Sequence, residues 1–172
     1  MNDNAKTTPG GTPPDPIPLA AKVGAARVAP EDATRLRVTL DVEGGSVDDR
    51  YEFHFEGTGV GDIQVEVKDR LRQLEVPPRV GQVDAGDMTE VLTSIDVGQI
   101  MALSRRLPPI PPDSTVGILR ISDGEQEVSV LFMADEGQAE TAGFELPEEL
   151  RRAVDTIYEI GAKQLEVESV KP

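Results

Sequence analysis

Apolar and polar residues alternate with a period of two in three consecutive segments, residues 36–42, 51–56 and 63–67. Such alternation is typical of a β-strand that turns one face to the core and the other to solvent. Glycine-containing stretches at residues 44–49 and 57–62 separate the three segments. The pattern therefore predicts an antiparallel meander with one solvated face.

Two further strands are predicted at residues 116–121 and 127–133, and the Asp-Gly pair between them favours a hairpin. The third segment of the meander continues as a strand-like run over residues 63–76, until Pro77 and Pro78 interrupt the pattern. We therefore expect about five strands.

Apolar residues recur at helical spacing in two other regions. Asp84 or Asp87 can cap the first helix, whose apolar residues continue to position 95. Gly98 weakens this helix, so we expect two short helices or a kink, with the helical part ending at Leu107. The second region, residues 147–163, begins with Pro and two acidic residues and predicts the clearest helix of the chain.

Together these elements predict one acidic α+β domain over residues 31–172. In it, an antiparallel sheet packs one face against two or three helices. Residues 1–30 hold six of the fourteen prolines and no aromatic residue, a composition that predicts a disordered Pro-rich tail.

Charge and composition exclude several classes of function. The 172 residues include 32 acidic and 17 basic side chains, and the formal net charge of −15 would repel a nucleic acid or an anionic membrane surface. No segment has the roughly 18 to 20 consecutive apolar residues of a membrane-spanning helix. Without cysteine there is no disulfide, thiolate metal site or Cys nucleophile. The polar N-terminus lacks a secretory signal, so we expect a cytoplasmic protein.

His54 is the one histidine, and strand alternation places it on the polar face between Glu52 and Glu56. We expect Arg35 and Arg37 to face these residues across the strand pair. An imidazole among carboxylates can shuttle protons or bind a metal ion, but a solvated histidine is the interpretation that we favour.

Other catalytic motifs are absent. There is no Gly-x-Ser-x-Gly elbow, Walker lysine or calcium-loop spacing, and the glycines at residues 57–61 precede a strand instead of a helix, which favours a hairpin over a phosphate cradle. The many carboxylates fit turns, helix caps and a solvated surface. We predict no catalytic residue, metal or cofactor, and keep a small carboxylate-based hydrolase or metal-binding enzyme as the alternative.

The sharpest short motif is a proline-rich segment after two arginines. It reads R-x-L-P-P-x-P, a pattern that can present a left-handed proline helix to a partner protein. The alternative is that the prolines only stiffen a helix-to-strand connection. We place a candidate partner-binding surface on this segment and on the turn at residues 44–49. Its residues are Arg105, Arg106, Leu107, Pro108, Pro109, Ile110, Pro111, Gly44 and Gly45.

Four features follow one another along the chain: Val42-Glu43-Gly44-Gly45, Leu107-Pro108-Pro109, Ser122-Asp123-Gly124 and the helix at residues 147–165. In this order the chain resembles the emfourin-type inhibitors of thermolysin-like peptidases, which are small cytoplasmic bacterial domains. It departs from them in its length, in the segment at residues 63–76, and at Ser46, where an aromatic residue is expected. The resemblance implies a binding role. We therefore expect a non-catalytic protein-binding or accessory protein with an inhibitor-like action.

Overall fold

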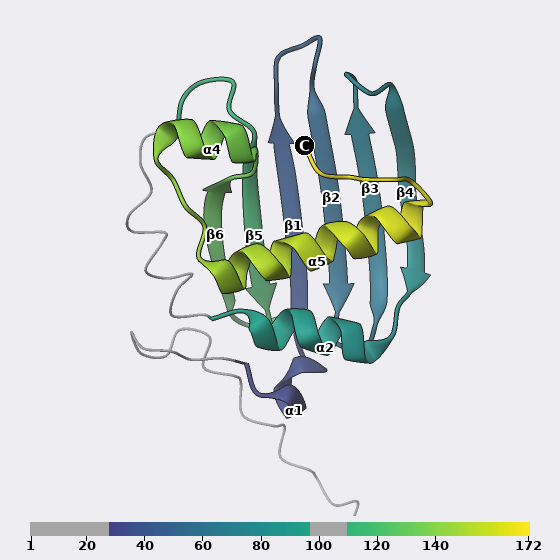
Figure 1. Cartoon of the computed structure of the whole chain (residues 1–172). Coiled ribbons are helices and arrows are strands. Elements are labelled where there is room, and N and C mark those ends of the chain that lie inside the picture. Colours follow the sequence, from purple (N-terminus) through teal and green to yellow (C-terminus); the bar gives the residue numbers. More distant parts are fainter. Residues whose placement is uncertain (1–27, 97–109) are drawn as a thin grey trace, which may run out of the picture.

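The computed structural model describes residues 28–96 and 110–172, which form an antiparallel sheet with helices on one face (Figure 1). The strands follow the order β4-β3-β2-β1-β5-β6 across the sheet, so the predicted α+β class is confirmed with six strands instead of about five. The strands are β1 (Arg37–Gly44), β2 (Tyr51–Thr58), β3 (Asp62–Asp69), β4 (Leu74–Gln82), β5 (Val116–Ser122) and β6 (Glu127–Met133). The helices are α1 (Pro30–Ala33), α2 (Ala85–Ser94), α4 (Glu136–Ala142) and α5 (Glu148–Leu165).

The predicted meander is confirmed in β1, β2 and β3. Leu40 of β1 lies opposite Phe55 of β2, which in turn lies opposite Val65 of β3. All three side chains are fully buried, whereas the residues directly before and after each of them on its strand are polar and half-buried or exposed. Alternation along each strand therefore builds a core face and a polar face on the same sheet.

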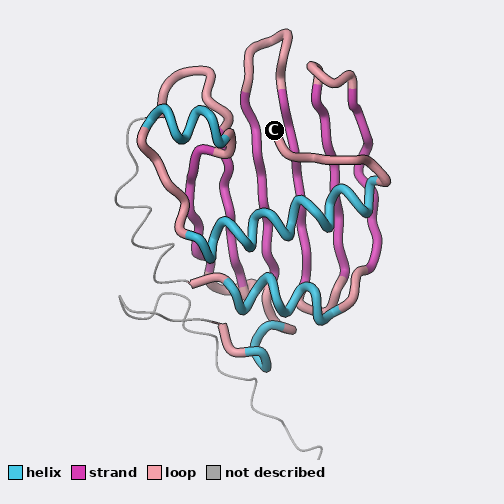
Figure 2. The backbone as a smooth tube through the Cα atoms, viewed as in Figure 1, coloured by secondary structure: helices cyan, strands magenta, loops and turns pink. Residues whose placement is uncertain are grey.

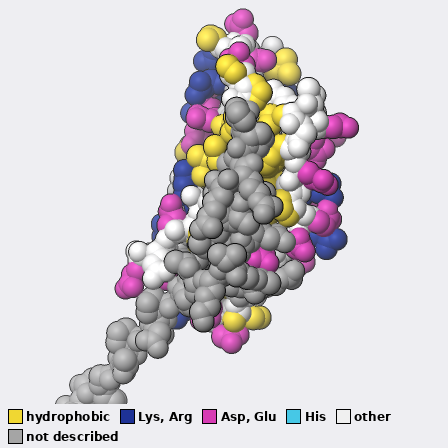
Figure 3. Space-filling view, turned by 90° about the vertical axis from the view of Figure 1, so that its left-hand side faces the viewer, with side chains coloured by type: hydrophobic (Ala, Val, Ile, Leu, Met, Phe, Trp, Pro, Cys, Tyr) yellow, Lys and Arg dark blue, Asp and Glu magenta, His cyan; other side chains and the backbone are white. Residues whose placement is uncertain are grey.

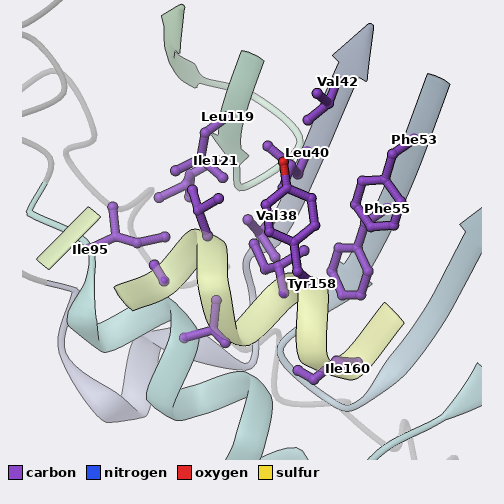
Figure 4. Packing of buried hydrophobic residues seen from close by; sticks show 14 of the residues in the cluster. Val38, Leu40, Val42, Phe53, Phe55, Ile95, Leu119, Ile121, Tyr158 and Ile160 are labelled. Atoms are coloured by element: carbon purple, nitrogen blue, oxygen red, sulfur yellow. The ribbon is translucent and has the colours of Figure 1, made fainter. Parts of the chain in front are cut away.

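The helices lie against the core face of the sheet. Helix α5 crosses the strands and α2 lies along one end of them (Figure 2). Side chains from β1, β2 and β5 converge on α5, where the rings of Phe53 and Tyr158 lie 5.2 Å apart (Figure 4). The predicted cap is confirmed, since the Asp84 carboxylate accepts a hydrogen bond from the Gly86 amide at 2.7 Å. The predicted extension of this helix to Leu107 falls on residues 97–109, outside the described part of the chain.

Strand β4 runs through Pro77 and Pro78, where we expected the strand pattern to end. It is an edge strand, so its outer side can hold a residue without an N–H group and lose no hydrogen bond. The pairing with β3 also shifts, because both prolines lie opposite Glu66, between the pairs formed by Val65 and Val67. Such a bulge tolerates proline. The predicted single segment at residues 63–76 is thus divided among β3, the β3–β4 turn and the first residues of β4.

The N-terminal boundary also differs from the prediction. Val28 is 5% exposed and belongs to the hydrophobic core with Ala33, so the packed domain includes residues before position 31. Residues 1–27, the rest of the predicted tail, lie outside the described part. The sequence pattern did not predict helix α4 either. None of its residues is buried, so it has no apolar face whose spacing could indicate a helix.

The segment after α5 turns back over β3 and β2 (Figure 1). Val170 in this segment is 1% exposed, and its carbonyl oxygen accepts a hydrogen bond from the Tyr51 hydroxyl. Burial raises the pKa of Tyr51 well above its ordinary value. Arg72 donates a further hydrogen bond of 2.8 Å to the carbonyl of Lys171. The C-terminal segment is therefore part of the packed domain.

Candidate functional site

The turn between β1 and β2 is held in one shape by its own side chains. Gly45 adopts a positive φ of 80°, a region that favours glycine. Oδ1 of Asp49 accepts hydrogen bonds from the amide and the hydroxyl of Ser46, at 2.5 and 2.6 Å. These hydrogen bonds hold the pKa of the Asp49 carboxyl below its ordinary value, because they favour the charged form.

The neighbouring turn between β3 and β4 supports the first one. The Arg70 guanidinium donates a hydrogen bond of 2.6 Å to the carbonyl of Val47, and the Arg70 amide donates to the carbonyl of Arg50. Val47 is 77% exposed and Leu71 is 78% exposed, one on each turn. Figure 1 shows both turns at the same end of the sheet. Two apolar side chains therefore stand in solvent on turns that hold each other in place. We call the residues 44–50 and 69–73 the paired turns.

The glycine half of the predicted surface lies beside the strand that follows the proline-rich segment. A Cβ atom on Gly44 would lie 2.3 Å from the Cα atom of Thr115, so only glycine permits this approach. Thr115 is buried and its amide donates a hydrogen bond of 2.8 Å to the Gln138 side chain on α4. Ile110 is half-buried and Pro111 is exposed. The other proline-rich residues of the prediction lie outside the described part. They are Arg105, Arg106, Leu107, Pro108 and Pro109.

Leu71 and Arg70 were missed by the sequence reasoning. Both lie just after a strand that the alternation identified, but the turn was hidden inside the segment that we interpreted as one strand. A prediction of the β3–β4 turn would have placed Leu71 at its tip. The polar surroundings of an isolated leucine give no other signal.

The second candidate site lies on the polar face of the sheet, around His54. Its Nδ1 atom lies 2.6 Å from Oδ1 of Asp41, which is directly opposite on β1, and the other Asp41 oxygen accepts a hydrogen bond from Arg120 of β5. The expected arginine partners differ: Arg37 lies 3.2 Å from Glu56, as predicted, whereas Arg35 lies 3.8 Å from Asp32 at the end of α1. Asp41 is the closer partner because the register places it opposite the imidazole.

Further ion pairs continue across this face and line a depression of about 390 Å³ with His54. Lys68 lies 2.9 Å from Glu66 and 3.9 Å from Glu52. Arg50 also bonds to Glu52, and this hydrogen bond lowers the pKa of the glutamate, whereas the bond to Glu66 raises the pKa of Lys68. The Glu52 carboxylate is therefore stabilised as an anion. A general acid needs the opposite, a carboxyl with a raised pKa.

Within residues 28–96 and 110–172, no three His, Asp or Glu side chains are grouped so that they could hold a metal ion. In the same residues no helix combines the length and apolar character needed to cross a membrane. The chain matches no protein-family model and no curated protein sequence.

Proposed function

We propose that this chain is a non-catalytic protein-binding protein that meets its partner through the paired turns and residues 105–111. An inhibitor-like action on a thermolysin-like peptidase is the specific form that the resemblance in the sequence implies. A cytoplasmic location is part of the same proposal.

The observation that carries the proposal is the fixed, apolar end of the sheet. A partner that docks on Val47 and Leu71 gains hydrophobic contact. It orders little of the chain on binding, because Arg70 and Asp49 already hold both turns. Preorganised loops bind more tightly than flexible ones for this reason. The acidic surface elsewhere, with a net charge of −15, disfavours contacts with other acidic proteins.

The test is a titration of a thermolysin-like peptidase with the full chain, with inhibition and calorimetric binding as the two measurements. We expect saturable binding that Val47→Asp weakens about tenfold or more, because a charge would be buried at the contact. Val80→Asp is the matched control, since Val80 is also 77% exposed but lies on β4. Ile110→Asp and Arg105→Ala examine the proline-rich half.

Two results would count against the proposal. If the peptidase is neither bound nor inhibited, the inhibitor-like action is wrong. If it is bound and Val47→Asp weakens binding no more than Val80→Asp, the paired turns are not the contact surface.

The alternative, a small hydrolase or metal-binding enzyme, draws on one observation, the contact of His54 with Asp41 in the depression on the polar face. A carboxylate can orient an imidazole as a general base. Calorimetric titration with Zn²⁺ and a panel of ester and glycoside substrates tests it. Binding or turnover that His54→Gln abolishes would favour the enzyme.

A further inference from the structure

A pocket of about 890 Å³ opens in the helical layer, on the core side of the sheet. It lies between α4, the first half of α5, the end of β6 and the C-terminal segment, where Figure 1 shows no helix over the strands. Its apolar walls come from Phe132 on β6, Phe144 and Leu146 in the α4–α5 connection, and Val154 on α5. The pocket is separate from the paired turns and from the depression around His54.

Tyr158 also lines this pocket, with a side chain that ends in a buried hydroxyl. The residue is 4% exposed, and its hydroxyl makes no hydrogen bond to any described residue. Figure 4 shows the hydroxyl end of the ring reaching from α5 toward Leu40 of β1. Burial raises the pKa of Tyr158 above its ordinary value, so the group is a neutral hydroxyl that can donate or accept. Leu40 does not line the pocket, so the pocket meets the ring of Tyr158 while the hydroxyl points into the core of the domain.

The rim of the pocket is acidic. Its charged residues are Asp135, Glu136, Glu140, Glu145, Asp155, Arg151 and Lys171. Both basic groups already have acidic partners: Arg151 bonds to Glu148, and Lys171 lies 2.6 Å from Asp155. Viewed from the β6 side, hydrophobic side chains gather in a band that lies between acidic and basic side chains (Figure 3). The rim thus favours a cationic group next to an apolar one.

We propose that this pocket binds a peptide segment of a partner protein that carries one large apolar side chain beside a lysine or arginine. The apolar side chain packs against Phe132, Leu146 and Val154, and the basic side chain meets the rim near Glu140 and Glu145. A second copy of this chain does not fit the charge, because each copy carries −15. The inference rests on the proposed binding function but uses a different surface.

The probe is a nine-residue peptide with a central Phe between two Arg residues and Gly-Ser flanks, titrated into the ¹⁵N-labelled full chain and followed by amide chemical shifts. We expect saturable shifts confined to α4, residues 143–146 and the first half of α5. A peptide with Phe between two Glu residues, and one with Gly between two Arg residues, should each bind at least about tenfold more weakly.

Variants then separate the charge from the hydroxyl. The double variant Glu140→Lys, Glu145→Lys should weaken the Arg-Phe-Arg peptide about tenfold or more, whereas Glu90→Lys on α2, also exposed, should not. Tyr158→Phe should leave the affinity for the peptide unchanged and the melting temperature unchanged or higher, because it removes an unsatisfied hydroxyl that faces Leu40 instead of the pocket. A lower melting temperature together with unchanged affinity would show that the hydroxyl serves the fold only.

The inference is overturned if the Arg-Phe-Arg peptide shows no saturable binding, if the Glu-flanked peptide binds equally well, or if the shifts fall outside the pocket. Val47→Asp keeps this result distinct from the proposed function. It should leave the affinity for the peptide unchanged. If the chain binds the peptide but no peptidase, the pocket is supported as a binding site and the paired turns are not. If it binds a peptidase but not the peptide, the paired turns are supported and the pocket is not.

Discussion

The two turns of the β1–β2–β3 meander are both rich in glycine, yet their surroundings are opposite. At the β2–β3 turn, the Gly59 amide donates to the carbonyl of Leu36 at 2.9 Å, and the Gly61 carbonyl accepts from the amide of Val83 at 2.9 Å. The β1–β2 turn contains Gly45, and its side-chain hydrogen bonds run within the turn and to the neighbouring β3–β4 turn. Glycine content therefore does not distinguish a turn that closes the core from one that can meet a partner. The neighbours of the turn do.

The largest expected effect comes from the β2–β3 turn. A Cβ atom on Gly59 would lie 1.8 Å from the carbonyl oxygen of Ala33, which is backbone and cannot rotate away. Gly59→Ala should therefore lower the free energy of unfolding by about 3 kcal/mol, as overpacked or strained sites do. Urea denaturation followed by circular dichroism measures this change.

Val60→Ala is the control in the same turn, because Val60 is 54% exposed and has little contact to lose. Its effect on the free energy of unfolding should stay within about 0.5 kcal/mol. Similar losses for both variants would mean that the close approach of Gly59 to Ala33 is not what restricts this turn.

The stability of the β1–β2 turn should depend on pH. The pKa of Asp49 lies below its ordinary value of 3.8 because Ser46 bonds to the carboxylate. A depressed pKa means that the carboxylate stabilises the turn above about pH 4, and that this contribution is lost as the pH falls through the folded-state pKa. Amide hydrogen exchange of Ser46 should therefore lose protection on acidification before the amide of Leu40, which reports unfolding of the whole sheet. Parallel loss at both amides would contradict this prediction, and Asp49→Ala should remove the early phase.

A smaller effect on stability is expected at the apolar tips. Leu71→Asp and Val47→Asp should each change the free energy of unfolding by less than about 0.5 kcal/mol, because both side chains already lie in solvent. For a partner that binds the paired turns, Leu71→Asp should nevertheless weaken the complex several-fold. Thermal melts and calorimetry on the same samples separate the two quantities. A large loss of stability would show that these side chains serve the fold.

The parts of the fold that follow from local periodicity could be predicted from the sequence. The alternation in β1, β2 and β3 and the spacing in α5 each required only one segment at a time, and Asp84 marked the start of α2 by its capping chemistry. Strand β4 could not be predicted in this way, because Pro77 and Pro78 are tolerated only through its edge position and a bulge. Both depend on where the strand lies in the sheet.

The candidate sites depend on tertiary contacts even more. The sequence indicated the turn at residues 44–49, but its support by Arg70 requires the β3–β4 turn to lie alongside. Tyr158 lies in the predicted helix at residues 147–163, and nothing in the helical spacing shows that its hydroxyl has no hydrogen-bond partner among the described residues. His54 was placed on the correct face, whereas its contact with Asp41 required the strand register.

The smallest effect is expected midway between the two turns, at His54. Its side chain is 34% exposed and that of Asp41 is 39% exposed, so solvent screens their contact, and Arg120 remains beside Asp41 when the imidazole is removed. His54→Ala should therefore change the free energy of unfolding by no more than about 0.5 kcal/mol and leave partner affinity unchanged. Arg120→Ala is the informative comparison, because it removes the cation that bonds to Asp41 and also lies 3.9 Å from Glu127. It should destabilise the sheet more than His54→Ala does. The reverse order, or loss of a metal or an activity in His54→Ala, would make the polar face the functional one and the paired turns a structural end of the sheet.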